Sequence, residues 1–371
     1  YSRHAQERCL FYKRLDNGKT AYILLHVDDL GIMIHPGSPE WKRVRDIMEA
    51  KYEQMSIKTG DKVKSIGLEL ERNRDKNRFE IRMTEYLAKL AGIHEVDTTK
   101  CNEKNPADSL NFKNEDYDGI EDEFIHDEEG RLLYRSLVMS MQYGNWVVPS
   151  VKYHVIHLAT RQAHPKKGDY QKALRVLRYM YTKRMDAVHI YGIGDGDIII
   201  YVYTDAAFDV YRDSISHSGM SIFIGEAGGA IYCHSNKQKC VTRSSTEAEI
   251  VAAIDGLDIA QYYRAILNAL GYKATVIHYE DNMSSMSLIS TGCYAYDKKD
   301  RHIVRKINYM HEYFEDKSNE ATMVWCPTHL MLGDLMTKDM HGSQFSDLES
   351  VTRGITNIDL KIYEKKRVKK G

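Results

Sequence analysis

The stretch Ile198-Ile-Ile-Tyr-Val-Tyr-Thr-Asp205 decides the fold prediction. It is a run of apolar and β-branched residues that ends in an aspartate, which is typical of a buried strand with its carboxyl end at the edge of a sheet. Two further strand-like runs follow at 218–225 and 230–233. After them, Ser244-Ser-Thr-Glu-Ala-Glu249 leads into a long segment whose apolar residues have helical spacing. This order predicts three strands followed by a helix that packs on them.

Two more strands complete the pattern. The run Ala274-Thr-Val-Ile-His-Tyr-Glu-Asp281 also ends in an aspartate, and a last strand at 321–327 precedes Gly333-Asp-Leu-Met-Thr-Lys338. We therefore expect a mixed five-stranded sheet covered by helices. Because ligands bind at the carboxyl ends of strands in open α/β sheets, four acidic residues should meet at one edge of this sheet: Asp205, Glu249, Asp281 and Asp334. The glycine before Asp334 should weaken the helix predicted there by up to about 1 kcal/mol.

A group of carboxylates suggests a metal site. Clustered carboxylates repel one another, and they stay ionised only if a cation lies between them. Oxygen ligands without a nearby Cys or His pair favour Mg²⁺, with Mn²⁺ as an alternative, over zinc. Two such ions about 4 Å apart can activate water and stabilise the leaving oxygen in phosphodiester cleavage. The simpler interpretation is that strand-end aspartates and first-turn glutamates serve as turn and cap residues. The joint occurrence of four such acids favours the metal site.

A series of motifs resembles the ribonuclease H domain of copia-type LTR retrotransposon polyproteins. In chain order they are Tyr203-Thr-Asp-Ala206, Lys237-Gln-Lys239, Ser244-Ser-Thr-Glu-Ala-Glu249, Glu280-Asp-Asn282, Arg301-His-Ile303 and Asp334-Leu-Met-Thr-Lys338. The resemblance covers nearly all of 198–340. It implies that Asp205, Glu249, Asp281 and Asp334 are the catalytic residues and hold two Mg²⁺ ions. Glu247 is the alternative to Glu249 if the register slips by two residues.

The same resemblance implies an RNA–DNA hybrid as the nucleic acid partner. Lys237, Lys239 and Arg243 are expected between the third strand and the long helix, where basic side chains can contact phosphates. A surface loop without a partner is the alternative. Arg301 and His302 lie in a second basic stretch at the start of a helix. Contacts to 2′-hydroxyl groups would distinguish a hybrid from duplex DNA.

The amino-terminal part resembles a reverse transcriptase palm. Residues 21–34 form an apolar run broken by Asp28-Asp29, which predicts two strands around an acidic turn. The resemblance implies that Asp28 and Asp29 bind metal in the polymerase site. A palm needs a third aspartate on a neighbouring strand, but Asp16 lies in an Asp-Asn-Gly turn signal. We therefore expect no DNA synthesis by this chain alone, and we expect the upstream part of the same polyprotein as a partner.

Periodicity predicts further elements between the palm hairpin and the ribonuclease H-like segment. A helix is expected over 38–52, a hairpin that pairs 63–70 with 78–82, and a second helix from Thr84 onward. The hairpin resembles the primer grip of the same family.

The chain is thus divided into five predicted parts, with an α/β and α+β fold class. Residues 1–100 are predicted to be the C-terminal part of a palm with its primer-grip region, and 101–130 a solvated acidic linker. Residues 131–190 are predicted to be a helical connection, whose basic side faces either phosphates or solvent. Residues 191–341 are predicted to form a ribonuclease H-like domain, and 342–371 a basic tail that binds nucleic acid, directs the protein to the nucleus or only increases solubility.

Composition adds few restrictions. The 371 residues are 43% hydrophobic and carry a net charge of −1, so nucleic acid binding would depend on a local groove. The six cysteines lack zinc spacing and are expected as free thiols, and no membrane partner is expected. The predicted function is a metal-dependent ribonuclease H, located in a cytoplasmic retroelement particle with the nucleus as a second location. The alternative is an inactive element remnant that binds nucleic acid or acts as a scaffold.

Overall fold

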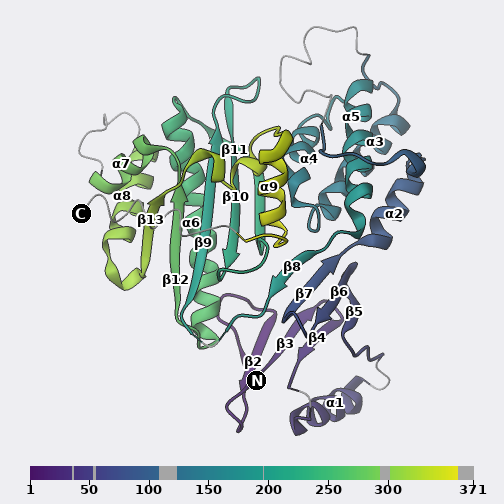
Figure 1. Ribbon diagram of the computed structural model, residues 1–371, viewed down its shortest axis with the longest axis vertical. Coiled ribbons are helices and arrows are strands. Elements are labelled where there is room, and N and C mark those ends of the chain that lie inside the picture. The colour runs from purple at the N-terminus through teal and green to yellow at the C-terminus, as the bar shows by residue number, and fades with distance from the viewer. Residues whose placement is uncertain (36, 53–55, 108–122, 195, 293–300, 358–371) are drawn as a thin grey trace.

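The computed structural model describes residues 1–35, 37–52, 56–107, 123–194, 196–292 and 301–357. Half of the predicted acidic linker, the first residues of the basic stretch before α8 (297–300) and the basic end of the predicted tail lie outside the described residues. The described part contains three β-sheets and two groups of helices, as the predicted α/β and α+β class requires (Figure 1). Of the helices described, none has the length and apolar character to cross a bilayer.

The amino-terminal region is a four-stranded antiparallel sheet followed by a helix. Its elements are β1 (Ser2–Arg3), β2 (Leu10–Arg14), β3 (Thr20–His26), β4 (Asp29–Met33) and α1 (Pro39–Tyr52). The pair His26↔Asp29 closes β3 and β4 into a tight hairpin, so the two strands predicted around the acidic turn are confirmed. Helix α1 has the predicted bounds because Ser38 Oγ accepts from the Glu40 amide and Pro39 begins the first turn.

The second sheet corrects the prediction for 63–70. Its strands are β5 (Lys62–Ser65), β6 (Leu68–Asn73), β7 (Arg78–Arg82) and β8 (Val188–Tyr191). The expected single strand is wrong because Ile66 and Gly67 both have positive φ, 50° and 71°, and form a two-residue turn between β5 and β6. Strand β7 pairs antiparallel with β8, so the chain returns to this sheet after the helical connection.

The helical connection forms one core with the helix that follows β7. The helices are α2 (Thr84–Ile93), α3 (Glu128–Gly144), α4 (Lys152–Ala159) and α5 (Lys167–Thr182), with short 3₁₀ turns η1 (Thr98–Lys100), η3 (Pro149–Val151) and η4 (Lys183–Met185). Leu87, Tyr134 and Leu177 are fully buried where these helices meet. The helices predicted in this region are therefore present, and the region ends with strand β8.

Glu103 lies inside the protein, which corrects the solvated-linker prediction at this position. Its Oε1 is 3.0 Å from Arg175 Nη1 and 3.1 Å from Arg178 Nε. The side chains of Glu103 and Arg175 are only 8% and 11% exposed. These two arginines belong to the basic side predicted for the connection, so that side is partly used to bind an internal carboxylate.

The third sheet has the predicted five mixed strands. They are β9 (Ile198–Ala207), β10 (Ile215–Ile224), β11 (Tyr232–Val241), β12 (Ala274–Glu280) and β13 (Ala321–Trp325). The spatial order is β11-β10-β9-β12-β13. Strand β10 is antiparallel to β9 and β11, whereas β12 is parallel to β9 and β13. Strand β11 is longer than predicted, so Lys237 and Lys239 lie within a strand and not in the loop before the long helix.

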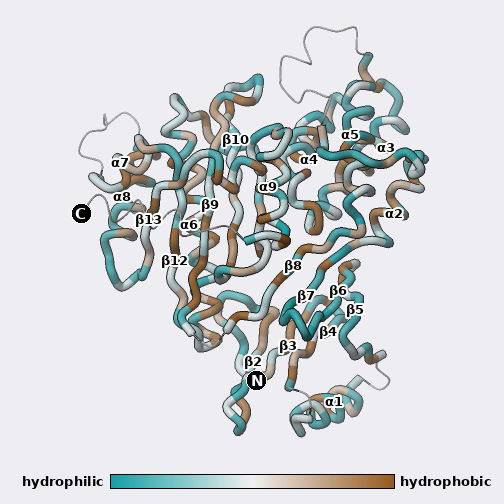
Figure 2. Tube along the Cα trace, in the orientation of Figure 1, coloured by the Kyte–Doolittle hydropathy of each residue, from teal (hydrophilic) through white to brown (hydrophobic). Residues whose placement is uncertain are grey.

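Helix α6 (Ser245–Ala269) covers one face of this sheet. Ser244 caps it by accepting from the Glu247 amide. Its buried residues Ala260 and Leu267 pack against Ile200 and Val202 of β9. Figure 2 shows the hydrophobic stretches of β9 and β12 on which this packing depends. The helix therefore holds its first turn at the carboxyl end of β9.

The remaining elements surround the sheet. They are α7 (Met283–Thr291), α8 (Arg301–Glu315), α9 (Gly342–Thr352), and the 3₁₀ turns η6 (Lys317–Asn319), η7 (Thr328–Leu330) and η8 (Asp334–Met336). Only a single 3₁₀ turn forms at Asp334, where a helix was expected. The range predicted as a tail begins with α9, which buries Phe345 and Leu348 in the core.

Candidate active site

Three of the predicted acidic residues lie together. One carboxylate oxygen from each of Asp205, Glu249 and Asp281 lies within 4.8 Å of the other two, and these residues form the one such group of potential ligands among the described residues. Asp205 and Glu249 are buried, and Asp281 is half-buried. The arrangement fits a divalent cation bound by oxygen ligands.

The fold explains why these three residues meet. Strands β9 and β12 are parallel and pair Tyr203 with Tyr279, and the same offset of 76 positions places Asp281 beside Asp205. The amino-terminal end of α6 then brings Glu249 to the same end of the sheet. Glu247, the alternative to Glu249, is directed elsewhere: its Oε2 accepts from the Arg243 amide at 2.9 Å. The geometry thus places Glu249 in the group, and its catalytic role stays a prediction.

The fourth predicted acid, Asp334, reaches the group through a lysine. Lys338 Nζ lies 2.6 Å from Asp334 Oδ1 and 3.2 Å from Asp205 Oδ1. Thr337 Oγ1 donates to the other oxygen of Asp205. Asp334 is therefore linked to Asp205 through the ammonium group of Lys338, but it does not belong to the three-ligand group. Lys338 and Thr337 belong to the motif Asp334-Leu-Met-Thr-Lys338, but no sequence pattern predicts these contacts.

Burial and mutual repulsion dominate the electrostatics of the site. Burial, with the charges of Asp205, Glu280 and Asp281, raises the pKa of Glu249 well above its usual value. Burial and the charge of Asp205 raise the pKa of Asp334 to about 7, although Lys338 opposes the shift. The pKa of Asp281 is raised for the same first two reasons. Such groups favour a bound cation, because without one they bind protons instead.

Glu280 is a fifth carboxylate that the sequence analysis did not select. It is fully buried, and its Oε1 accepts from Ser285 Oγ at 3.0 Å. Its Oε2 and the Oε2 of Glu249 are buried without a hydrogen-bond partner among the described residues. Burial raises the pKa of Glu280 well above its usual value. Two buried carboxylate oxygens without donors are a second indication that the site fits a cation.

The loop that carries Asp334 is firmly attached to the sheet. Met331, Leu332 and Met336 are buried, and the Met336 carbonyl accepts from Ser235 Oγ at 2.6 Å. A Cβ at Gly333 would lie 2.8 Å from the Cβ of Asp205, so the glycine permits a close approach to β9. The expectation that Gly333 weakens a helix is therefore wrong, since the residue lies before a 3₁₀ turn and lets the loop pack.

The predicted polymerase acids are at a different place. Asp28 and Asp29 are exposed at the β3–β4 turn, where Val27 has a φ of 54°. Within the described residues they do not belong to any group of three potential metal ligands. A metal-binding role of Asp28 and Asp29 stays a prediction.

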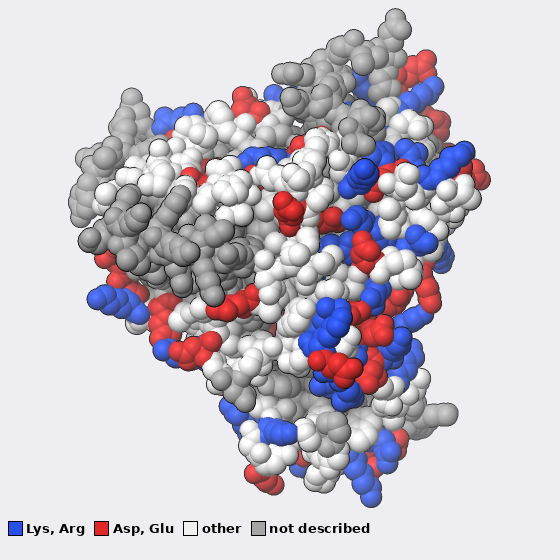
Figure 3. Space-filling model, in the orientation of Figure 1, with Lys and Arg blue, Asp and Glu red and all other residues white. Residues whose placement is uncertain are grey.

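The predicted nucleic-acid contacts are spread over two elements and a loop. Lys237 pairs with Asp213 and lies over the Tyr211 ring. Arg243 is exposed but pairs with Glu247. The other three side chains are exposed, on β11 and in the first turn of α8: Lys239, Arg301 and His302. Acidic and basic side chains are intermixed on the face in Figure 3, which agrees with a net charge near zero.

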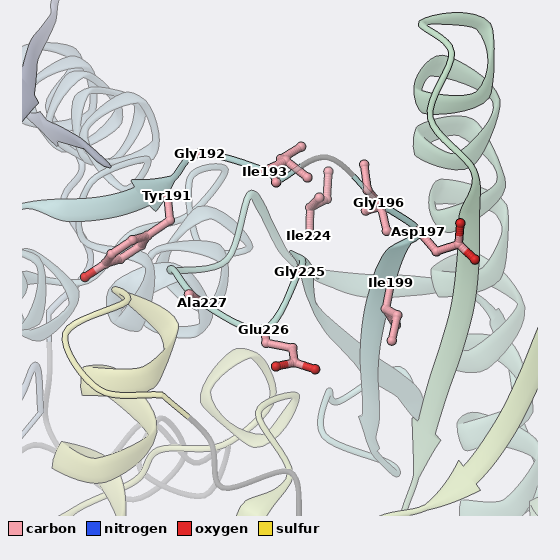
Figure 4. Close-up of a pocket in the computed structure, with 12 residues that line it drawn as sticks. Tyr191, Gly192, Ile193, Gly196, Asp197, Ile199, Ile224, Gly225, Glu226 and Ala227 are labelled. Carbon is pink, nitrogen blue, oxygen red and sulfur yellow. The ribbon is translucent and has the colours of Figure 1, made fainter. Parts of the chain in front are cut away.

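One cavity lies away from the acidic residues. It has a volume of about 350 Å³ and is lined by the segment after β8, by the start of β9 and by the β10–β11 turn (Figure 4). Asp197 and Ile199 line it, whereas Asp205 is at the other end of β9. The candidate active site therefore lies at the opposite end of β9 from this cavity.

Comparison with known proteins places the chain among retroelement proteins. It is 27% identical over 228 residues to the Pol polyprotein of transposon RE1 of Arabidopsis thaliana, a match that covers 61% of this chain and 15% of that one. It is 22% identical over 349 residues to the Pol polyprotein of transposon TNT 1-94 of Nicotiana tabacum, with 93% and 25% covered. A putative transposon Ty5-1 protein of Saccharomyces cerevisiae is 26% identical over 261 residues, with 68% and 78% covered. No family model matches the chain.

Solved structures of polymerases and nucleases are also similar. A foamy viral protease-reverse transcriptase in complex with dsDNA is 12% identical, with a TM-score of 0.44. The match covers 82% of this chain and 55% of the viral chain. RNase H1 of Halobacterium salinarum NRC-1 is 16% identical, with 35% and 86% covered and a TM-score of 0.24. LC11-RNase H1 in complex with an RNA/DNA hybrid is 18% identical, with 38% and 93% covered and a TM-score of 0.28.

The five-stranded mixed sheet has the strand order of a ribonuclease H-type fold, and the sequence is similar to those of retroelement Pol polyproteins. More narrowly, the chain is a distant homologue of copia-type retrotransposon Pol polyproteins. It spans 15% and 25% of the RE1 and TNT 1-94 polyproteins.

Proposed function

We propose that the chain is a metal-dependent ribonuclease H that cuts the RNA strand of an RNA–DNA hybrid. The observation that carries the proposal is the group formed by Asp205, Glu249 and Asp281, whose oxygens come from three different elements and lie within 4.8 Å of one another. The setting supports it, because the group lies at the carboxyl end of the central strands of a ribonuclease H-type sheet in a retroelement protein.

The residues fit divalent cations. The donor set is oxygen only, two buried carboxylate oxygens have no hydrogen donor among the described residues, and several of these carboxylates have raised pKa values. Asp205, Glu249 and Asp281 would hold one Mg²⁺ or Mn²⁺ ion, and Asp205 with Asp334 a second. Bound ions would supply Lewis-acid activation of water and neutralise the charge on the 3′ oxygen leaving group.

The chain's own residues position these ligands and the substrate. Thr337 orients Asp205 by donating to it, and Ser285 fixes Glu280 beside Glu249. In this proposal Lys239, Arg243, Arg301 and His302 contact the hybrid's phosphates or sugars from β11, the loop before α6 and the start of α8. Lys237 would first have to leave Asp213.

Polymerase function is proposed only with the upstream part of the polyprotein, because Asp28 and Asp29 lack a third ligand among the described residues. The proposed place of action is a retroelement particle in the cytoplasm, with the nucleus as the second location.

The test is cleavage of an end-labelled hybrid by the full chain in Mg²⁺, in EDTA and with two matched variants. Asp205→Asn should abolish cleavage without unfolding the protein. Asp197→Asn should cleave normally, because Asp197 directly precedes β9, at the end of the strand opposite Asp205, and pairs with Lys273. Equal cleavage by Asp205→Asn and the unmutated protein would refute the metal assignment. Absence of cleavage by the folded, unmutated chain would favour the inactive remnant.

A further inference from the structure

The cation already present in the candidate active site is the ammonium group of Lys338. Its Nζ lies 2.6 Å from Asp334 Oδ1 and 3.2 Å from Asp205 Oδ1. Lys338 thus forms ion pairs with two of the acidic residues of the site. Asp334 does not share the three-oxygen group of Asp205, Glu249 and Asp281. Lys338 therefore occupies the space between Asp205 and Asp334, where a second divalent cation would have to bind to bridge them.

The surroundings make the lysine displaceable. Its side chain is 41% exposed, whereas the side chains of Asp205 and Asp334 are 2% and 4% exposed. Its loop is held independently of it, by the Met336 carbonyl and by Thr337. The ammonium group can thus leave by rotation of its own flexible side chain while both carboxylates stay in place.

We propose that Lys338 is a built-in counter-cation that competes with the second metal ion for Asp205 and Asp334. This inference rests on the proposed function, since it assumes a metal site at Asp205, Glu249 and Asp281. In the protein without nucleic acid, Lys338 neutralises Asp205 and Asp334 and leaves one site for a divalent ion. The second ion binds when Lys338 turns away. Lys338 is a positioning residue in this scheme.

The experiment is a Mn²⁺ titration of the full chain without nucleic acid, followed by electron paramagnetic resonance of the free ion. The unmutated protein should bind one ion tightly. Lys338→Gln should bind a second ion at least about tenfold more tightly than the unmutated protein, because removal of one competing charge contact of moderate strength changes affinity by about this factor. Lys338→Arg keeps the positive charge and should behave as the unmutated protein does.

Lys273→Gln is the matched control. Lys273 also lies between two carboxylates, 3.2 Å from Glu320 Oε1 and 3.6 Å from Asp197 Oδ2, but it is at the opposite end of β9 and β12. Its replacement should leave Mn²⁺ binding unchanged.

A second readout is thermal stability. Lys338→Gln should have a lower Tm than the unmutated protein in EDTA, because two buried carboxylates then lose the ammonium group that pairs with both. Mg²⁺ should restore the Tm of this variant more than it raises that of the unmutated protein. If the variant does not fold in EDTA, refolding in Mg²⁺ should rescue it.

The outcomes separate the two proposals. One bound ion in all four proteins would overturn the role of Lys338 only, and so would two tightly bound ions in the unmutated protein. A Tm of Lys338→Gln that is unchanged in EDTA, or that Mg²⁺ does not restore, would do the same. Absence of Mn²⁺ binding in every protein would overturn the proposed metal site itself.

Discussion

Replacement of Gly333 by alanine tests how closely the Asp334 loop packs on the sheet. Gly333 has a φ of −62°, which alanine adopts freely, so conformational entropy alone would make Gly333→Ala stabilising by about 0.4–1 kcal/mol. The new Cβ would lie 2.8 Å from Asp205 Cβ, 2.9 Å from Asp205 N and 3.0 Å from the carbonyl carbon of Thr204. Two of these neighbours are backbone atoms of a central strand and cannot move aside cheaply.

Overpacking of this kind costs about 1–3 kcal/mol, which exceeds the entropic gain. We therefore expect the free energy of unfolding to fall by about 1–2 kcal/mol, measured by urea unfolding in EDTA. Metal affinity should fall as well, because the clash is with the residue shared by both proposed ions.

Gly92→Ala is the control for this experiment. Gly92 lies in α2, and a Cβ there meets nothing within 4 Å, so alanine should stabilise the protein by about 0.5–1 kcal/mol. If Gly333→Ala is as stable as the unmutated protein or more stable, while Gly92→Ala behaves as expected, the close packing of the loop on Asp205 is refuted.

Three further predictions concern other parts of the chain. Ile66→Asn should raise the free energy of unfolding by about 1 kcal/mol in urea unfolding, because Ile66 has a φ of 50° in a turn that favours Asn-Gly, and a decrease would contradict the turn. Glu103→Ala should lower the free energy of unfolding by about 3 kcal/mol, because it leaves Arg175 buried without the carboxylate of Glu103. Glu123 is exposed, so Glu123→Ala should leave the free energy of unfolding nearly unchanged. Similar effects of the two substitutions would support the solvated linker. The third concerns pH: the pKa of Asp334 is raised to about 7, so its contribution to stability is fully present below its ordinary pKa of about 3.9 and is lost as the pH rises through 7. Between pH 5.5 and 7.5 in EDTA, the Tm of the unmutated protein should therefore fall relative to the Tm of Asp334→Asn. A Tm difference that stays constant over this range would exclude the raised pKa.

The acids that could be placed from the sequence are those fixed by regular elements. Asp205 and Asp281 end apolar runs that form parallel neighbouring strands, and Glu249 follows a helix cap by five residues, so strand and helix geometry alone bring them together. Lys338 could not be placed in this way. Its contact with Asp205 depends on a loop that is held by side chains distant in sequence. The periodicity of apolar residues does not predict the course of such a loop.

Long-range pairing and polar strands were the other source of error. Strand β7 pairs with β6 on one side and with β8, more than a hundred residues later in the chain, on the other. Local sequence patterns contain no information about the pairing with β8. Strand β11 continues through His234-Ser-Asn-Lys-Gln-Lys239, where the apolar pattern ends, because its backbone pairs with β10 through Val241. At Ile66 and Gly67 the apolar residues on both sides favoured a continuous strand, whereas the positive φ angles of both residues form a turn.

Strand-specific cleavage is the most direct test of the central claim. An RNA–DNA hybrid labelled separately on each strand, together with duplex DNA and single-stranded RNA of the same sequence, would be incubated with the full chain and Mg²⁺. The account predicts cuts in the RNA strand of the hybrid only, and no cuts in EDTA. Mg²⁺-dependent cutting of the DNA strand or of duplex DNA, or cutting of the hybrid that persists in EDTA, would contradict it.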